Sequence, residues 1–228
     1  MKGRVIGGLW IIAALCLFYF GWGGQYFTFL LFACFLMAAM EIYEIVYGEY
    51  WRMDPSACRP RNAWAIQLTI LCFAMLSILF LERDEAAVVG LICIFSDVGA
   101  FAFGKLIGKH RVKAIKQISP NKTWEGYLGG NLIAWLTGFI TCHLFGIALT
   151  PGVIIFIALS GLISEIGDLL GSATKRQLGV KDSGEALVNF PITKWIEYPL
   201  RGHGGYLDRV DSISLGIVVY AIITTIAS

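Results

Sequence analysis

Long apolar runs, separated by shorter polar connections, are the dominant pattern of this chain. Each run is long enough for a helix to cross a hydrocarbon core that is roughly 30 Å thick. The pattern therefore predicts an all-α, polytopic integral membrane protein with about seven transmembrane helices. The predicted spans are residues 5–21, 25–46, 63–81, 86–103, 127–149, 151–171 and 212–227.

The composition agrees with this pattern. Of the 228 residues, 57% are hydrophobic and only 15% are charged, whereas a soluble domain carries about 25% charged residues. The six cysteines form no CxxC pair and are interpreted as small buried hydrophobic residues. The first run follows Lys2 and Arg4 without a small-residue cleavage site, and we interpret it as a retained span. We expect no second soluble domain and no nucleic-acid partner.

Basic residues alternate between the two sides of the predicted bundle. If the N-terminus is cytoplasmic, Arg83 is the only lysine or arginine that falls on the outer side. The positive-inside rule therefore predicts a cytoplasmic N-terminus and a C-terminus outside. Both long polar loops, residues 104–126 and 172–211, then face the cytoplasm, where a charged water-soluble substrate can reach them.

Carboxylates within or beside the apolar runs are the first candidates for chemistry, because charge next to hydrocarbon is costly. Asp97 lies in the fourth run, and Glu165 and Asp168 lie in the sixth. Asp208 and Asp211 precede the last run at helical spacing and at the cytoplasmic depth of Asp168. Oxygen ligands without a His or Cys cluster suit a hard cation such as Mg²⁺. An ion pair with a neighbouring lysine or arginine is the alternative for each acid, and it is as strong an interpretation as function for Glu165.

Small residues accompany the acids in the sixth run. Such stripes let helices approach one another closely, so we expect this face to point into the bundle. The residues concerned are Gly161, Gly167 and Gly171.

The first cytoplasmic loop contains a candidate anion site. Pro120 sets a turn, Ser119, Lys122 and Thr123 supply donors, and a helix is predicted to begin at about Thr123. Donors beside a helix N-terminus bind anions, although Thr123 serves equally well as a plain N-cap. The basic residues before Ser119 are also typical of a lipid-facing collar.

The second cytoplasmic loop adds cations and a histidine. Lys175, Arg176 and Lys181 lie near acids that are candidates for a metal site, which is the combination that phosphoryl and nucleotidyl transfer require. The alternative is that Lys175 and Arg176, just past a helix C-terminus, complement its dipole. His203 lies between glycines and is interpreted as a proton carrier or a phosphate donor that contacts substrate.

Taken together, these residues resemble the phosphatidate cytidylyltransferase (CDP-diacylglycerol synthase) family. Its C-terminal signature reads Ser-x-x-Lys-Arg, four residues, Lys-Asp-x-Gly, and then Pro-x-His-Gly-Gly-x-x-Asp-Arg-x-Asp. The resemblance covers about residues 95–212, so we divide the chain into N-terminal transmembrane helices (1–94) and a catalytic transmembrane domain (95–228). The matching positions are Ser172, Lys175, Arg176, Lys181, Asp182, Gly184, His203, Gly204, Gly205, Asp208, Arg209 and Asp211.

The resemblance implies transfer of CMP from CTP to phosphatidic acid, which gives CDP-diacylglycerol and pyrophosphate in phospholipid biosynthesis. It implies an active site on the cytoplasmic face of a bacterial inner membrane, Mg²⁺ with room for a second cation, membrane lipid as a partner and a homodimer as one assembly. The implied metal ligands are Asp97, Asp168, Asp208 and Asp211. The implied catalytic residues are Lys175, Arg176, Lys181, Asp182, His203 and Arg209, and the implied substrate-binding residues are Ser119, Asn121, Lys122, Thr123, Glu125, Gly204 and Gly205.

One departure from the family pattern concerns spacing. Lys181 and His203 are separated by about 13 more residues than in the signature, and the extra segment lies within residues 185–200. Its aromatic residues and prolines suit a membrane interface, so it is either a lid or acyl-chain contact, or a tolerated loop.

Three other functions remain to be compared with the leading one. A related cytidylyl- or phosphotransferase could act on another lipid phosphate or lipid alcohol. An intramembrane aspartyl protease could use Asp97 and Asp168 from separate spans, but it leaves the cationic loops unexplained. A cation-coupled transporter would place its acids at mid-membrane, whereas these acids gather at one face.

Overall fold

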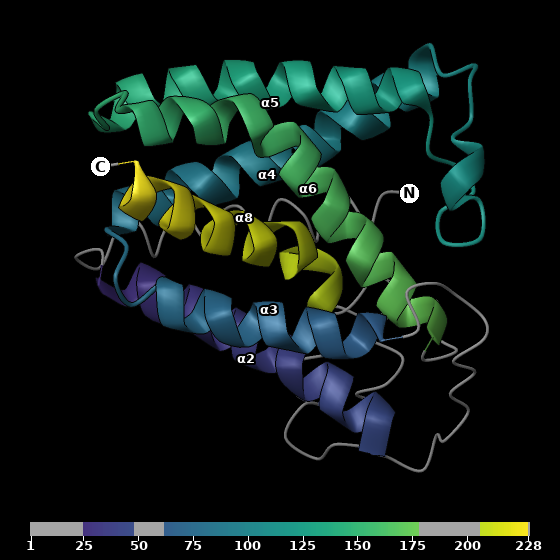
Figure 1. Cartoon of the computed structure of the whole chain (residues 1–228), viewed down its shortest axis with the longest axis horizontal. Coiled ribbons are helices and arrows are strands. Elements are labelled where there is room, and N and C mark those ends of the chain that lie inside the picture. Colours follow the sequence, from purple (N-terminus) through teal and green to yellow (C-terminus); the bar gives the residue numbers. More distant parts are fainter. Residues whose placement is uncertain (1–24, 48–61, 178–205, 228) are drawn as a thin grey trace.

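The computed structural model describes residues 25–47, 62–177 and 206–227, and within these ranges the chain is helical. Figure 1 shows the helices as a layered bundle, with α8 lying between α4 and the pair formed by α2 and α3. The elements are α2 (Gln25–Tyr47), α3 (Ala63–Ser77), α4 (Arg83–Leu106), the 3-10 helix η1 (Lys113–Ile115), α5 (Trp124–Phe145), α6 (Pro151–Gln177) and α8 (Leu207–Ile226). The described residues contain no β-strand, only an isolated bridge between Arg111 and Thr123.

Each predicted apolar run from residue 25 onward falls on a helix, with ends that differ by up to six residues; α8, for example, begins at Leu207 rather than at residue 212. Four of the helices, α4, α5, α6 and α8, are long and apolar enough to cross a membrane, while α3 and the apolar part of α2 are shorter. The prediction of an all-α protein is therefore confirmed for the described residues, whose character is that of an integral membrane protein. The first predicted run, residues 5–21, lies outside the described residues, and so the count of seven spans stays a prediction.

The helix that begins the second half of the bundle starts where the sequence predicts. Thr123 is the N-cap of α5, and its hydroxyl accepts a hydrogen bond from the backbone N–H of Gly126 over 3.1 Å. The helix ends at Gly146, whose φ of 68° lies in the left-handed region that glycine adopts without strain.

Helix α6 extends further than predicted. The apolar pattern predicted that this span ends at residue 171, with Lys175 and Arg176 beyond the helix, but both lie in its last turn. The reason is packing, since Ala173 and Thr174 are fully buried and no glycine or proline interrupts residues 172–177. Lys175 and Arg176 are therefore carried on a helix rather than on a loop.

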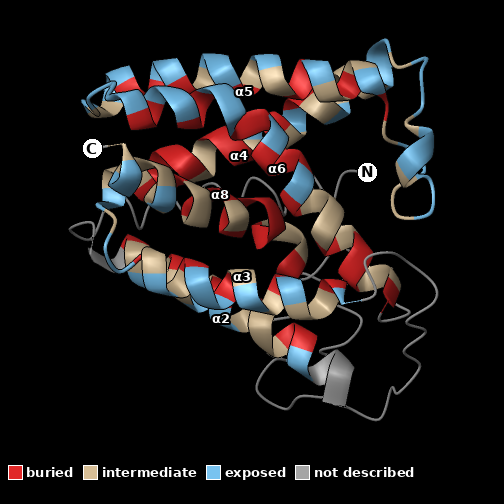
Figure 2. Ribbon diagram, viewed as in Figure 1, coloured by how far each residue is buried: buried red, intermediate tan, exposed pale blue. Residues whose placement is uncertain are grey.

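Helix α6 packs closely against its neighbours along the predicted small-residue face, against α5 at Gly161 and against α8 at Gly167 and Gly171. Gly161, Gly167 and Gly171 are all buried, which confirms that this face points inward. A Cβ atom added to Gly167 would lie 2.7 Å from the Cα of Ser212, so only glycine permits this approach. In Figure 2 buried residues follow the facing sides of α6 and α8, while α5 exposes most of its outer side.

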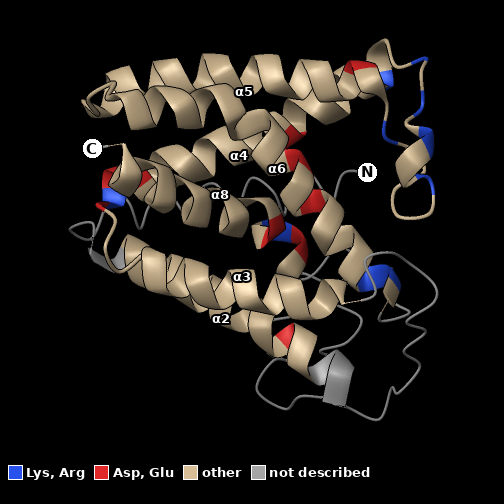
Figure 3. Ribbon diagram, in the orientation of Figure 1, with Lys and Arg blue, Asp and Glu red and all other residues tan. Residues whose placement is uncertain are grey.

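Charged side chains gather at one end of the bundle. In Figure 3 the charged residues cluster where α4 and α6 end and where α5 and α8 begin, with a smaller group at the opposite end near the start of α4. The central parts of the helices carry apolar residues, many of them exposed, such as Phe95, Leu136 and Leu159. This arrangement suits a bundle whose sides face hydrocarbon and whose charged end faces water.

Candidate active site

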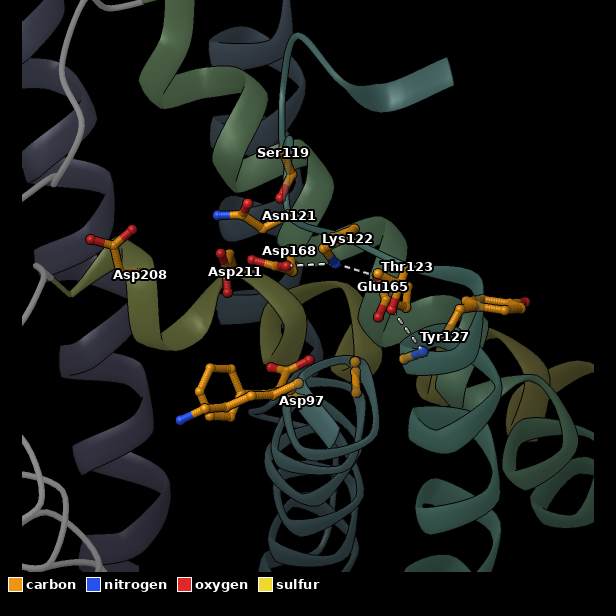
Figure 4. A pocket seen from close by; sticks show the side chains of 15 residues that line it. Asp97, Ser119, Asn121, Lys122, Thr123, Tyr127, Glu165, Asp168, Asp208 and Asp211 are labelled. Carbon is orange, nitrogen blue, oxygen red and sulfur yellow. Dashed lines mark hydrogen bonds and ion pairs between the residues drawn. The ribbon is translucent and has the colours of Figure 1, made fainter. Parts of the chain in front are cut away.

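A cavity of about 570 Å³ lies at the charged end of the bundle. Helices α4, α5, α6 and α8 and the loop before α5 all contribute side chains to it, as Figure 4 shows. The cavity brings together residues that are far apart in the sequence. The predicted site residues that line it are Asp97, Ser119, Asn121, Lys122, Thr123, Asp168, Asp208 and Asp211.

Asp97 is held by two hydroxyl groups from neighbouring helices. Ser164 of α6 donates to one carboxylate oxygen over 2.9 Å, and Ser212 of α8 donates to the other over 2.9 Å. These contacts join three helices at one carboxylate. Among the described residues no lysine or arginine forms an ion pair with Asp97, so the alternative of a simple ion pair does not describe this acid.

Lys122 bridges the two acids of α6. Its ammonium group forms ion pairs with Glu165 and with Asp168, the second over 2.7 Å. Burial would lower the pKa of Lys122, but the charges of Asp168 and Glu165 outweigh this effect and raise the pKa above its ordinary value of 10.5. Lys122 therefore stays positively charged at neutral pH. For Glu165, the ion-pair interpretation is the one that the structure supports.

Asp208 and Asp211 have different surroundings although both belong to the first turns of α8. Asp208 forms an ion pair with Lys175 from the end of α6. Asp211 is only 4% exposed, and one of its carboxylate oxygens accepts a hydrogen bond from the backbone N–H of Ser212 over 2.8 Å. A Cβ atom on Gly171 would lie 2.5 Å from the other oxygen, so α6 leaves room for the Asp211 carboxylate only because residue 171 is glycine.

The acids of the cavity are suitable in kind for a hard divalent cation. Asp97, Asp168 and Asp211 interact electrostatically with one another, and all four predicted ligands offer oxygen atoms to the same cavity. As placed, however, no three acidic, histidine or cysteine side chains of the described residues converge on one point. Three acids instead form ion pairs with lysines. Lys122 pairs with Glu165 and Asp168, and Lys175 pairs with Asp208. The set of donors fits Mg²⁺ by its chemistry.

The predicted nucleotide-binding loop divides into two groups. Ser119, Asn121 and Thr123 line the cavity together with Lys122, and Thr123 is an N-cap as well. Glu125 is not among the lining residues of the described chain. Its carboxylate accepts from the backbone N–H of His110 at 3.2 Å and lies 2.5 Å from the His110 Nδ1, so it ties the basic loop to the start of α5.

The remaining predicted residues either lie beside the cavity or fall outside the described chain. Arg176 and Arg209 are described but are not among the residues that line the cavity. Arg209 lies near the charges of Asp208 and Glu41, which places it toward α2. Residues outside the described ranges are Lys181, Asp182, His203, Gly204 and Gly205, together with the extra segment within 185–200.

The structure adds residues that the sequence analysis did not single out. Ser164 and Ser212 orient Asp97, and Glu41 of α2 contacts the start of α8. Serines are common in close-packed membrane helices, so their role could not be recognised from sequence. Glu41 did carry a signal, since it is an acid near the end of an apolar run.

Comparisons with known proteins identify relatives of this chain. A model of the cytidylyltransferase family matches residues 62–227. A phosphatidate cytidylyltransferase of Staphylococcus saprophyticus is 41% identical over 124 residues, which cover 54% of this chain and 42% of the relative. The phosphatidate cytidylyltransferases of Staphylococcus aureus and Mycobacterium bovis are each 37% identical, over 123 and 138 residues. These matches cover 54% and 58% of this chain, and 42% and 39% of the relatives. The chain thus matches about two fifths of the length of these curated relatives.

Proposed function

Because the chain belongs to the cytidylyltransferase family, we propose that it transfers the CMP group of CTP to phosphatidic acid, giving CDP-diacylglycerol and pyrophosphate. The observation that carries this proposal is that four aspartates and Lys122 line one cavity. The names of the relatives supply the substrates, and the cavity supplies the charged groups that such a transfer needs.

The chemistry asks for alignment more than for acid–base catalysis. A phosphate oxygen of the lipid attacks the α-phosphorus of CTP, a new P–O bond forms, and the bond to the β-phosphate breaks to release pyrophosphate. This nucleophile is already anionic at neutral pH, so it needs no strong general base. The protein's contribution is to hold two anions in line and to neutralise the charge that develops on the leaving group.

The cations of the site would serve the phosphates. Lys122 and Lys175 now face carboxylates, and we expect each to turn toward phosphate oxygens when CTP binds. Lys181, Arg176 and Arg209 are proposed to add positive charge, and Asp182 and His203 to complete the phosphate site. Ser119, Asn121 and Thr123 are proposed to hold the nucleotide from the cavity wall, with Gly204 and Gly205 allowing close backbone approach.

We propose that four aspartates are the ligands of Mg²⁺, with space for a second cation. These are Asp97, Asp168, Asp208 and Asp211. Held by these carboxylates, the ion would supply positive charge that stabilises the charge developing on the phosphates. The chain's own part is to gather the carboxylates, and the hydroxyls of Ser164 and Ser212 keep Asp97 oriented toward the other acids.

The proposed topology places the cavity at the cytoplasmic surface. The positive-inside pattern supports a cytoplasmic N-terminus and an outer C-terminus, with about seven spans in a bacterial inner membrane. Phosphatidic acid from the bilayer and CTP from the cytosol could then meet at the charged end of the bundle. A homodimer is the assembly that we propose to test by mass measurement in detergent.

The deciding experiment is an assay of purified protein in detergent with labelled CTP, Mg²⁺ and a panel of lipids. We expect pyrophosphate release and a labelled lipid product with phosphatidic acid, and none in the presence of a chelator. A preparation of the Asp211→Asn variant serves as the background control. Turnover with another lipid phosphate or a lipid alcohol, but not with phosphatidic acid, would replace the proposed substrate. No pyrophosphate release with any lipid would overturn the proposal.

A further inference from the structure

Glu41 of α2 makes an unusual contact with the start of α8. Its side chain is fully buried, and its two carboxylate oxygens accept hydrogen bonds from the backbone N–H groups of Tyr206 and Leu207 over 2.7 and 2.8 Å. The first N–H groups of a helix have no partner within the helix. The start of α8 lacks a side-chain cap of its own, so Glu41 supplies this cap from a distant part of the chain.

Charge strengthens the contact. The N-terminus of a helix carries a partial positive charge, and a carboxylate placed there is stabilised. Hydrogen bonds with one ionised partner are also shorter and stronger than neutral ones. Arg209, the third residue of the same helix, carries a full positive charge that interacts electrostatically with Glu41. The buried carboxylate of Glu41 therefore faces the positive end of α8 and lies near a positive side chain.

The contact lies next to two acids of the cavity. Asp208 follows Leu207 directly, and Asp211 lies one turn further along α8. Asp208 must meet Lys175, and Asp211 must fit the space above Gly171, which tolerates no added methyl group. A change in the position of the first turn of α8 would move both carboxylates at once.

We propose that Glu41 is a positioning residue that holds the first turn of α8 so that Asp208 and Asp211 point into the cavity. This inference rests on the proposed function for its catalytic consequence. Glu41 lies outside the residues 62–227 matched by the family model, so a helix beyond the matched segment sets the geometry of the site. Glu41 acts through Asp208 and Asp211 and touches no substrate.

The test replaces Glu41 by Gln and uses Glu85→Gln as a matched control. Each glutamate accepts two hydrogen bonds, one through each carboxylate oxygen. Glu85 of α4 accepts from the Tyr220 hydroxyl of α8 over 3.0 Å and from the backbone N–H of Glu82 over 3.1 Å. A glutamine has only one acceptor oxygen, so in Glu41→Gln an NH₂ group must face one of the backbone N–H groups. The two variants thus make the same chemical change at opposite ends of one helix.

Three quantities are measured for each variant in detergent: kcat and KM for CTP, the melting temperature, and deuterium uptake of amides 206–212. We expect Glu41→Gln to lower kcat by about tenfold or more, with KM changed far less, because misplaced acids affect the transition state most. Deuterium uptake at 206–212 should rise. Glu85→Gln should leave kcat within about twofold and uptake at 206–212 unchanged, whatever it does to the melting temperature.

Each outcome decides a different point. A wild-type kcat in folded Glu41→Gln, or unchanged uptake at 206–212, overturns the inference. Equal losses of kcat in both variants would show a general packing effect and would also overturn it. The uptake measurement needs no turnover, so absence of wild-type activity would refute the proposed function while the role of Glu41 in fixing α8 is still decided by uptake.

Discussion

The two ends of α8 each meet a glutamate from another helix, and they use it in different ways. At the far end Glu85 of α4 accepts from the phenol of Tyr220, whose ring packs edge-on against Phe156 with centroids 5.1 Å apart. At the near end Glu41 of α2 accepts from the helix backbone itself. The far contact joins a neutral phenol to a carboxylate through a hydrogen bond between two side chains. The near contact fixes a helix terminus.

The difference continues in what surrounds each contact. The near end collects carboxylates that repel one another, namely Asp97, Asp168 and Asp211. Like charges gathered in a partly buried cavity destabilise the folded state unless cations compensate for them. The far end also carries acids, Glu82, Asp84 and Glu85, but these are exposed or half-buried and lie outside the cavity. Groups that are costly for stability are typical of sites that carry out chemistry, which is why the near end is the candidate active site.

The largest effect is expected for Asp211→Asn. The substitution keeps the size of the side chain and removes the charge at the most buried acid of the cavity. Turnover should fall by at least about 10³-fold, while folded protein still accumulates. The matched control is Asp84→Asn at the far end, where Asp84 pairs with Arg83 near the surface. Near-normal turnover in Asp211→Asn would remove this residue from the site.

Lys122→Met should have the next largest effect. It removes the cation that bridges Glu165 and Asp168, so kcat/KM for CTP should fall by about 10²-fold, and the melting temperature should fall as well. The exposed Lys113 of η1 gives the control variant Lys113→Met, which should change neither quantity appreciably. If both variants lose activity equally, the basic loop acts through its overall charge and not through Lys122.

The same pair predicts a pH dependence. The pKa of Lys122 is raised in the folded protein, so the stability that its ion pairs contribute is complete below its ordinary pKa of 10.5 and is lost as the pH rises through the higher folded value. The difference in melting temperature between wild type and Lys122→Met should therefore stay constant between about pH 7 and pH 9. A difference that shrinks steadily over this range would mean that Lys122 loses its proton there.

Gly171→Ala should have a smaller effect on activity. The added methyl group would lie 2.5 Å from a carboxylate oxygen of Asp211, so either the carboxylate or the helix must shift. We expect kcat to fall by about tenfold and stability to fall by about 1–3 kcal/mol. Gly90→Ala is the control, because a Cβ atom at this position in α4 meets nothing within 4 Å. Wild-type kcat in Gly171→Ala would mean that the position of Asp211 is not critical.

The smallest effect on activity is expected at the far end. Tyr220→Phe removes the hydrogen bond to Glu85 and keeps the aromatic packing against Phe156. Stability should fall by about 1 kcal/mol, and kcat should stay within about twofold of wild type. A large loss of kcat without loss of stability would show that the two ends of α8 are coupled, and it would weaken the contrast between them.

Much of the fold followed from the hydrophobic pattern. The apolar runs predicted the helices because a membrane-spanning element needs a nearly continuous apolar stretch, which is visible in any sequence. The end of α6 was misplaced because residues 172–177 look polar, and only their burial against neighbouring helices shows that the helix continues. The segment that holds Lys181 and His203 lies outside the described residues, so its predicted roles are still to be tested.

The candidate site was predictable in its residue types but not in its pairings. Asp97, Asp168, Asp208 and Asp211 could be selected because charge beside hydrocarbon is costly, and the structure places all four at one cavity. That Lys122 would bridge Glu165 and Asp168, and that two serines would orient Asp97, depends on the distances between helices. A sequence without aligned relatives contains no record of those distances.

The sequence by itself therefore determined the membrane-embedded helical class, the family resemblance and the candidate acids, since these depend on local composition and spacing. The tertiary structure decided which cation faces which acid, and it revealed that Glu41 caps α8 from a helix outside the matched segment. The physical reason is that a hydrogen bond acts only over about 3 Å, so its partners are chosen by packing and not by order along the chain.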